Sequence, residues 1–209
     1  MNGIVKLYTD LKKHYGDPVE YWPRWCAKTR DTTLAEEILV GAILVARTSW
    51  HNTEIALKNL MTNNYLSIKK LAKSTEDELV GMVRPAGFYT TKPKRLIGLC
   101  KYIVTNGGVE AVGQKETARL RNELLELEGV GPETADTLIN YVFDRPKFVI
   151  DEYTRRTVKK MRLASKFDYD GLQKMFEAAL PKDAEMYRDF HALIIVNQVG
   201  RERAKMSLL

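Results

Sequence analysis

Residues 124–151 read LLELEGVGPETADTLINYVFDRPKFVID, and this stretch decides the fold expected for the 209-residue chain. Residues 117–127 place leucines on one face of a helix and charges on the other. Gly129 and Gly131 allow backbone angles that other residues avoid, so the chain can turn tightly after this helix. Pro132 suits the first position of a second helix, where its missing N–H costs nothing. The sequence therefore predicts two short helices joined by a hairpin whose N–H groups can hold phosphate.

Two interpretations of this stretch are open when each part is taken alone. LEGVG is also an ordinary cap at the end of a helix, and an aspartate before a helix, such as Asp151, is most often an N-cap. The combination of the hairpin, the run FVID and the acid is more specific. It resembles the helix-hairpin-helix motif of the DNA glycosylase superfamily that includes endonuclease III and the adenine-mismatch glycosylase. In that superfamily the aspartate after the hairpin is catalytic, and the resemblance extends over roughly residues 20–200.

Alternation typical of strands is almost absent, so the chain is expected to be all-α. The resemblance implies two helical lobes that flank a cleft. It implies a six-helix, barrel-like domain at 33–145, with the helix-hairpin-helix at about 117–143, and a second helical domain built from 1–32 and 146–209. Apolar periodicity and capping residues predict helices at 1–15, 33–60 (with a turn at 48–51), 68–83, from 92 onward, after 151, at 171–180 and at 184–199.

Composition sets further limits on the class of protein. Lys and Arg outnumber Asp and Glu by 33 to 27, and the sequence pI is about 9.2, which mildly favours a polyanionic partner. No apolar stretch is long enough to span a bilayer, and the N-terminus does not read as a signal peptide. A cytoplasmic protein without a membrane partner is therefore expected. Cys26 and Cys100 are expected to be reduced thiols in the core.

The C-terminal sequence DFHALIIVNQVGRERAKMSLL resembles the helix and basic tail that lead into a four-cysteine iron–sulfur loop in many relatives. This chain has no cysteine there, and two cysteines elsewhere cannot replace four in one loop. No group of Cys and His residues has the spacing of a zinc site. No cofactor is therefore expected, and a monovalent ion at the hairpin is left open.

The hairpin also bears on the reaction. Bifunctional members of the superfamily use a hairpin lysine as a Schiff-base nucleophile, and the resemblance places Glu133 at that position. A carboxylate cannot form an imine, and Lys147 in the extended segment is a poor substitute. The resemblance therefore implies a monofunctional enzyme in which water displaces the base. Asp151 would stabilise the positive charge that develops on the sugar, or orient the attacking water.

Three segments resemble the 3-methyladenine glycosylase branch: EYWP at 20–23, TSW at 48–50 and RPAGFYTTKPKRL at 84–96. In that branch two aromatic residues sandwich the extruded base, and the matching positions are Tyr21 and Trp50, with Trp22 adjacent. An alkylated purine is positively charged, so aromatic faces bind it by cation–π stacking. That branch also has a lysine near the end of the final helix, where this chain has Val199 or Gly200. An N3- or N7-methylated purine is therefore the expected substrate.

Double-stranded DNA is the expected partner of a monomeric protein. The residues expected to contact it are Arg47, Lys92, Lys94, Gly129, Val130, Gly131 and Thr134. In the superfamily a glutamine fills the gap left by the extruded base, and Ala46 or Arg47 stands near that position here. Arg47 could replace this wedge in part or hold a phosphate.

Two other functions are open from the sequence. The first is a monofunctional glycosylase for a mismatched or deaminated base, which would need polar groups in its pocket. The second is a non-catalytic DNA-binding relative, favoured by the missing lysine and the altered wedge. Asp151 and the aromatic pair argue against this second function, because phosphate binding requires neither.

Overall fold

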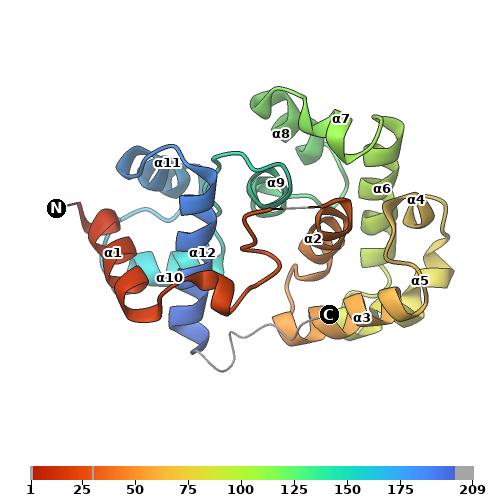
Figure 1. Cartoon of the computed structure of the whole chain (residues 1–209), viewed down its shortest axis with the longest axis horizontal. Coiled ribbons are helices and arrows are strands. Elements are labelled where there is room, and N and C mark those ends of the chain that lie inside the picture. Colours follow the sequence, from red (N-terminus) through yellow and green to blue (C-terminus); the bar gives the residue numbers. More distant parts are fainter. Residues whose placement is uncertain (1, 30, 201–209) are drawn as a thin grey trace. The chain divides into compact units, whose positions relative to one another are not determined.

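The computed structural model describes residues 2–29 and 31–200, and in this part of the chain it contains helices and turns but no strand (Figure 1). The prediction of an all-α fold is confirmed. The helices are α1 (Gly3–Tyr15), α2 (Thr32–Leu44), α3 (Trp50–Thr62), α4 (Ile68–Leu71), α5 (Glu76–Val83), α6 (Lys92–Thr105), α7 (Val109–Gly113), α8 (Thr117–Leu125), α9 (Pro132–Thr137), α10 (Glu152–Lys160), α11 (Tyr169–Ala179) and α12 (Ala184–Val199). Short 3₁₀ turns η1 (Pro18–Glu20) and η2 (Arg84–Ala86) and a π-helical turn η3 (Leu138–Val142) complete the described elements.

The chain divides into two compact units. Among the described residues, the terminal unit consists of residues 2–28 and 139–200, and the central unit consists of residues 29 and 31–138. The chain passes from the central to the terminal unit within the π-helical turn η3. Each unit has its own apolar interior, as separate helical units require.

The terminal unit is built around α12, which packs against α1, α10 and η1. α1 presents its apolar stripe to this core, as the periodicity of residues 1–15 predicts, and it also contacts α11. Stacked and edge-on aromatic rings fill the centre, with the Phe148 and Phe176 ring centroids 4.4 Å apart. The buried residues of this core are Ile4, Leu7, Leu11, Phe148, Ile150, Val158, Leu172, Phe176, Leu180, Tyr187, Phe190, Leu193 and Ile194.

The central unit packs α2 to α9 together. α2 is buried along most of its length, as its almost wholly apolar sequence requires, and it contacts α3, α6 and α9. α6 also packs against α4 and α5, and α8 packs against α9. Residues 68–83 form two helices rather than one, but the helix start expected near Ser74 and Thr75 is confirmed, because α5 begins after the Thr75 N-cap. Thr75 and Glu78 form a capping box that starts α5 separately from α4, because each satisfies a backbone N–H of the other.

Helix starts agree closely with the capping residues in the sequence. The side chains of Asp31, Ser49, Asp151, Asp168 and Asp183 each accept a hydrogen bond from a backbone N–H in the first turn that follows. Cys26 and Cys100 are buried and unbridged, in agreement with the expectation of reduced core thiols. Nowhere in residues 2–29 and 31–200 is a helix both long enough and apolar enough to span a bilayer.

Candidate functional site

The predicted hairpin lies between α8 and α9 in the central unit. The N–H of Val130 donates to the carbonyl of Leu127 at 3.0 Å and closes the turn, and Val130 itself is buried. Gly129 has φ +78°, a left-handed conformation that side chains disfavour. Gly131 has φ −92° and ψ −179°, which any residue can adopt, so the expectation that both glycines use special angles is wrong for Gly131. Pro132 takes the first position of α9, as predicted.

Gly129 is also in close contact with the side chain of Arg95 of α6. A Cβ at position 129 would lie 2.2 Å from both Cδ and Nε of Arg95, so no other residue fits while this arginine stays in place. The Arg95 side chain therefore crosses the hairpin at its tightest point. The sequence contains no local signal for this contact, because the two residues are far apart in the chain and only the packing of α6 brings them together.

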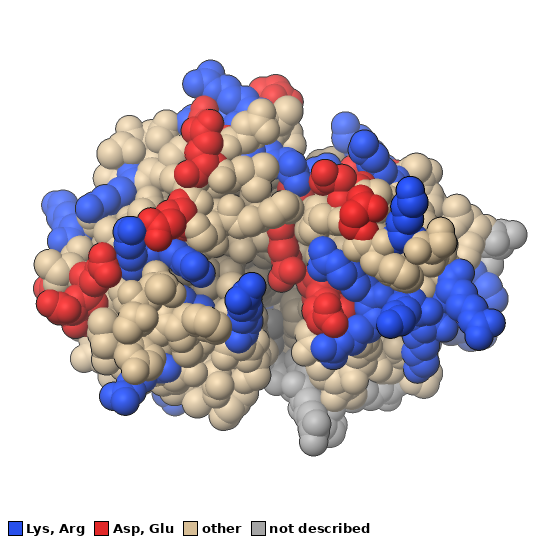
Figure 2. Space-filling view, turned by 180° about the vertical axis from the view of Figure 1, so that it is seen from behind, with Lys and Arg blue, Asp and Glu red and all other residues tan. Residues whose placement is uncertain are grey.

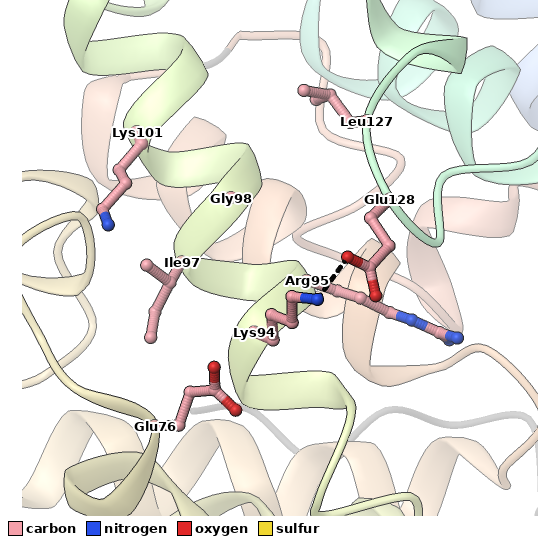
Figure 3. A pocket seen from close by; sticks show the side chains of 8 residues that line it. All are labelled: Glu76, Lys94, Arg95, Ile97, Gly98, Lys101, Leu127 and Glu128. Atoms are coloured by element: carbon pink, nitrogen blue, oxygen red, sulfur yellow. Dashed lines mark ion pairs between the residues drawn. The ribbon is translucent and has the colours of Figure 1, made fainter.

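A pocket of about 310 Å³ lies beside the hairpin in the central unit, between α6 and the end of α8 (Figure 3). Lys94 and Arg95 contribute positive charge to its wall, and Lys94 Nζ pairs with the carboxylate of Glu128 at 2.6 Å. Figure 3 shows Arg95 extending past Glu128 toward the hairpin turn. Both side chains of the Lys94–Glu128 pair are exposed, so Lys94 can exchange this partner for a phosphate at little cost.

Lys92 is not the DNA contact that the sequence predicts. Its side chain is 1% exposed, and its ammonium donates to the carbonyls of Leu44 at 2.6 Å and Ala86 at 2.7 Å. Burial, and to a smaller extent the nearby charge of Arg95, lower the pKa of Lys92 to about 8. A lysine held by two carbonyls inside its own unit cannot reach a phosphate, so Lys92 joins the end of α2 to η2 and the start of α6.

The remaining residues expected to contact DNA or the base in the central unit are accessible to different extents. Arg47 is exposed and has φ +58°, in the turn between α2 and α3 where the wedge residue was expected. Trp50 is the first residue of α3, after the Ser49 cap, and is half-buried. In α9, Glu133 is exposed and Thr134 is partly exposed.

The two aromatic residues expected in the base pocket from the N-terminal segment are buried. Tyr21 donates its hydroxyl to the carbonyl of Tyr15 at 3.2 Å, inside the terminal unit. Trp22 packs edge-on against Trp25, with ring centroids 6.4 Å apart. Both rings therefore help to anchor the loop after α1.

Asp151 lies at the N-cap of α10 in the terminal unit, where its side chain is buried. Its Oδ1 accepts a hydrogen bond from the N–H of Thr154 at 2.7 Å, so the expected N-cap geometry is present. Its Oδ2 lies 3.3 Å from Nε2 of His191, although the N–H of that ring does not point along the line of a good hydrogen bond. Burial by itself would raise the pKa of Asp151, but His191 and Thr154 outweigh it, and the pKa lies below the ordinary aspartate value. The site therefore holds a buried carboxylate in its charged form, beside the positive end of a helix dipole.

Tyr141 completes this cluster from the π-helical turn η3. Its hydroxyl lies 2.7 Å from Nδ1 of His191, on the side of the ring away from Asp151, and 3.4 Å from the carbonyl of Arg188. Sequence reasoning did not identify His191 or Tyr141 as site residues. The packing of α12 against α10 brings His191 to Asp151, and Tyr141 of η3 contacts His191 in turn. A lone histidine on a buried helix gives no local indication of such a role.

Lys147 is not a free amine in this structure. It pairs with Glu177 at 3.2 Å within the terminal unit, and its side chain is 21% exposed. Among the described residues, no cluster of His, Cys, Asp and Glu could hold a metal ion. Lys and Arg side chains are spread over much of the face in Figure 2, with acidic side chains between them, consistent with the net charge of +6.

The hairpin and the acid that follows it correspond to a known family. A family model described as HhH-GPD superfamily base excision DNA repair protein matches residues 40–182. The chain is 43% identical over 196 residues to the "Putative DNA repair glycosylase MJ1434" of Methanocaldococcus jannaschii, which covers 92% of this chain and 85% of that protein. It is 28% identical over 183 residues to the thymine-DNA glycosylase of Aeropyrum pernix, covering 85% of this chain and 75% of that one.

Solved structures agree with the sequence comparison. The structure is similar to that of the 3-methyladenine DNA glycosylase (MagIII) of H. pylori bound to 1,N6-ethenoadenine, with a TM-score of 0.75 and 29% identity. The match covers 94% of this chain and 95% of that chain. These findings confirm the family that residues 124–151 predict: the chain belongs to the HhH-GPD superfamily of base excision DNA repair proteins.

Proposed function

We propose that the chain is a monofunctional DNA glycosylase that removes an N3- or N7-methylated purine from double-stranded DNA and leaves an abasic site. The observation that carries the proposal is the state of Asp151, a buried carboxylate whose pKa is nevertheless lowered. Breaking an N-glycosidic bond builds positive charge on the sugar, and a charged carboxylate in a site of low dielectric stabilises that charge strongly. Phosphate binding does not require such a group.

Two features favour hydrolysis without strand cleavage. The hairpin position that bears the Schiff-base lysine in bifunctional relatives is Glu133, which cannot form an imine. Lys147, the other amine considered for that role, is paired with Glu177. Borohydride treatment during the reaction is therefore expected to trap no covalent protein–DNA adduct, and a trapped adduct would contradict the monofunctional mechanism.

The choice of an alkylated purine rests on an aromatic residue and on similarity. Trp50 is half-buried at the start of α3, so part of its side chain is accessible to a ligand. Stacking of a cationic purine on such a ring contributes about 0.5–2 kcal/mol. The similarity to the H. pylori enzyme supports the same substrate class. The buried Tyr21 would have to change its packing to stack on the base, so Trp50 is the more accessible of the two stacking residues.

A second candidate substrate is a mismatched or deaminated base. The similarity to the thymine-DNA glycosylase of Aeropyrum pernix favours it, at nearly the same identity as the H. pylori enzyme. The two candidates differ in charge, since a mismatched thymine or uracil is neutral. A cation–π contribution from Trp50 is therefore expected only for the alkylated purine.

The test is a comparison of base release from matched duplexes containing 3-methyladenine, 7-methylguanine, a G·T mismatch or a G·U mismatch. The wild-type protein is expected to release the methylated purines fastest. Trp50→Ala is expected to slow release of the methylated purines by about 2- to 30-fold, the loss that corresponds to one cation–π contact. Fast release of thymine or uracil alone would favour the second candidate. Retention of every base by a folded protein that binds the duplex would indicate the non-catalytic alternative.

A further inference from the structure

We propose that His191, oriented by the hydroxyl of Tyr141, is a positioning residue that fixes Asp151 for the glycosylase reaction. The inference rests on the proposed function and extends it, because it names the residues that orient the Asp151 carboxylate. All three residues belong to the terminal unit, so their geometry does not depend on the central unit.

The contacts form a continuous chain. Tyr141 approaches Nδ1 of His191 at 2.7 Å, and Nε2 on the opposite side of the same ring lies 3.3 Å from Oδ2 of Asp151. The second oxygen of Asp151 accepts from the N–H of Thr154 at 2.7 Å. Both carboxylate oxygens therefore have a fixed neighbour, one from α10 and one from α12. Rotation of the carboxylate about its last bond would break the hydrogen bond from Thr154 and move the other oxygen away from the ring of His191.

The hydroxyl of Tyr141 determines which nitrogen of His191 carries the proton. Burial raises the pKa of Tyr141 well above its ordinary value, so the hydroxyl keeps its hydrogen. It has two acceptors in reach, and the contact with His191 Nδ1 at 2.7 Å is much shorter than the contact with the Arg188 carbonyl at 3.4 Å. Donation to Nδ1 leaves the remaining ring hydrogen on Nε2, which is the atom nearest Asp151.

The surroundings make this arrangement rigid. Tyr141 is 1% exposed, its ring lies 5.6 Å from that of Trp25 and 5.8 Å from that of His191, and His191 is itself buried. The other titratable and charged groups that face this cluster are Cys26, Arg188 and Asp189. Asp189 is paired with Lys12 at 2.7 Å and Arg188 with Asp144, so the Asp151 carboxylate is the acid that the ring of His191 faces directly.

His191 also has an unused hydrogen-bonding group next to Asp151, which a residue that only packs in the core would not need. Its Nε2 is buried and has no hydrogen-bond partner of good geometry among the described residues, although it lies 3.3 Å from Oδ2 of Asp151. Rotation of either side chain would complete the bond when positive charge develops on the substrate. The chain Tyr141–His191–Asp151 would then support the acid during the reaction, as an orienting partner does in other catalytic sites.

The experiment measures single-turnover base release as a function of pH on the best methylated duplex, with DNA affinity measured in parallel. His191→Phe keeps a ring but removes both nitrogens, and it is expected to lower the rate by about 10- to 100-fold, the range for one hydrogen bond to a charged group. As the pH is lowered, this variant is also expected to lose activity at a higher pH than the wild type does, because the pKa of Asp151 rises without its partner. His191→Gln restores an N–H near the position of Nε2 and is expected to recover part of the rate.

Tyr141→Phe tests the orienting hydroxyl, and Tyr187→Phe is its matched control. Both tyrosines are buried in the terminal unit, but the ring of Tyr187 packs edge-on against Phe148 in the apolar core. Tyr141→Phe is expected to slow release several-fold with unchanged DNA affinity, while Tyr187→Phe retains the wild-type rate. Equal rates for the two variants, or an unchanged acid limb in His191→Phe, would overturn the positioning role.

A readout without substrate separates this inference from the proposed function. Unfolding of Asp151→Asn, His191→Gln and the double variant forms a cycle, and the effects of the two substitutions are expected to be non-additive because the side chains are in contact. Additive effects would overturn the inference. If the cycle shows non-additive effects but the wild-type protein releases none of the four bases, the proposed glycosylase function is overturned and the contact between His191 and Asp151 still stands.

Discussion

Lys92 and Asp151 are both charged side chains buried beside the first turn of a helix, one in each unit of the molecule. Lys92 is the first residue of α6 and is held by two backbone carbonyls, which carry only partial charge. Burial therefore dominates, and the pKa of Lys92 falls to about 8, toward the neutral form. Asp151 is the N-cap of α10, where a backbone N–H, a helix dipole and His191 all favour the anion.

The two groups therefore respond to burial in opposite ways. Burial moves the pKa of Lys92 toward neutrality, whereas the surroundings of Asp151 reverse that effect and keep its charge. A buried charge that the fold only tolerates is typical of a structural contact. A buried charge that several elements sustain is typical of a functional site. Burial alone does not distinguish a catalytic residue, and the partners of the buried group do.

The largest expected effect is on the Asp151 side of this comparison. Asp151→Asn keeps the shape of the side chain but removes its charge, so base release is expected to fall by about 100-fold or more, as for other groups that stabilise a charged transition state. Binding to the methylated duplex should change little. The measurement is single-turnover release alongside a binding titration. Release at the wild-type rate would contradict the proposed role of Asp151, and both buried charges would then be structural only.

Lys92→Met tests the other side of the comparison through stability. The substitution leaves the carbonyls of Leu44 and Ala86 without a donor, and each buried unsatisfied group costs about 1–3 kcal/mol, partly offset by removal of a buried ammonium. The free energy of unfolding, measured in urea, is expected to fall by about 2–4 kcal/mol. The rate of base release per folded molecule is expected to stay the same. A stable variant with weakened DNA binding would show that Lys92 contacts phosphate after all.

Alkaline pH separates the two charges without removing a side chain. The folded pKa of Lys92 is about 8, below the value of about 10.4 for an unfolded lysine. Between these values the unfolded chain holds a proton that the folded chain has lost, so stability rises with pH through this window. The contribution is at most about 3 kcal/mol. Because other groups also titrate, the quantity to measure is the wild-type change in unfolding free energy from pH 8 to 10 minus that of Lys92→Met. Equal changes in both proteins would contradict the lowered pKa.

The features that could be predicted from the sequence are those that adjacent residues specify. Gly129, Pro132 and the residue Asp151 itself define a turn, a helix start and a cap within a few positions, and each forms where expected. Position along the chain does not specify which face of a helix is buried against another element. Lys92 and Lys94 read alike in the sequence KPK, yet residues two apart on a helix point in directions about 200° different. One is therefore buried and the other exposed.

The residues that sequence reasoning missed depend on contacts between distant segments. His191 reaches Asp151 across 40 positions (191 − 151) because α12 packs against α10, and Tyr141 reaches His191 through the π-helical turn. Arg95 lies over Gly129 because α6 passes the hairpin. No local pattern marks such pairs, since their spacing is set by helix packing. The family resemblance located the acid that we propose to be catalytic but gave no information on the groups that contact it.

Lys94→Ala is expected to have the smallest effect. Unlike Lys92→Met, it is expected to change DNA binding and to leave stability nearly unchanged. The Lys94 side chain is 58% exposed and its partner Glu128 is 64% exposed, so their ion pair contributes about 0–1 kcal/mol to stability. If Lys94 holds a phosphate when DNA is bound, its loss weakens binding to every duplex alike and reduces the slope of log affinity against log salt by about one. Lys92→Met should leave that slope unchanged. A salt slope that falls in Lys92→Met and not in Lys94→Ala would reverse the assignment of the two lysines, and with it the inference that burial in the central unit excludes a residue from DNA.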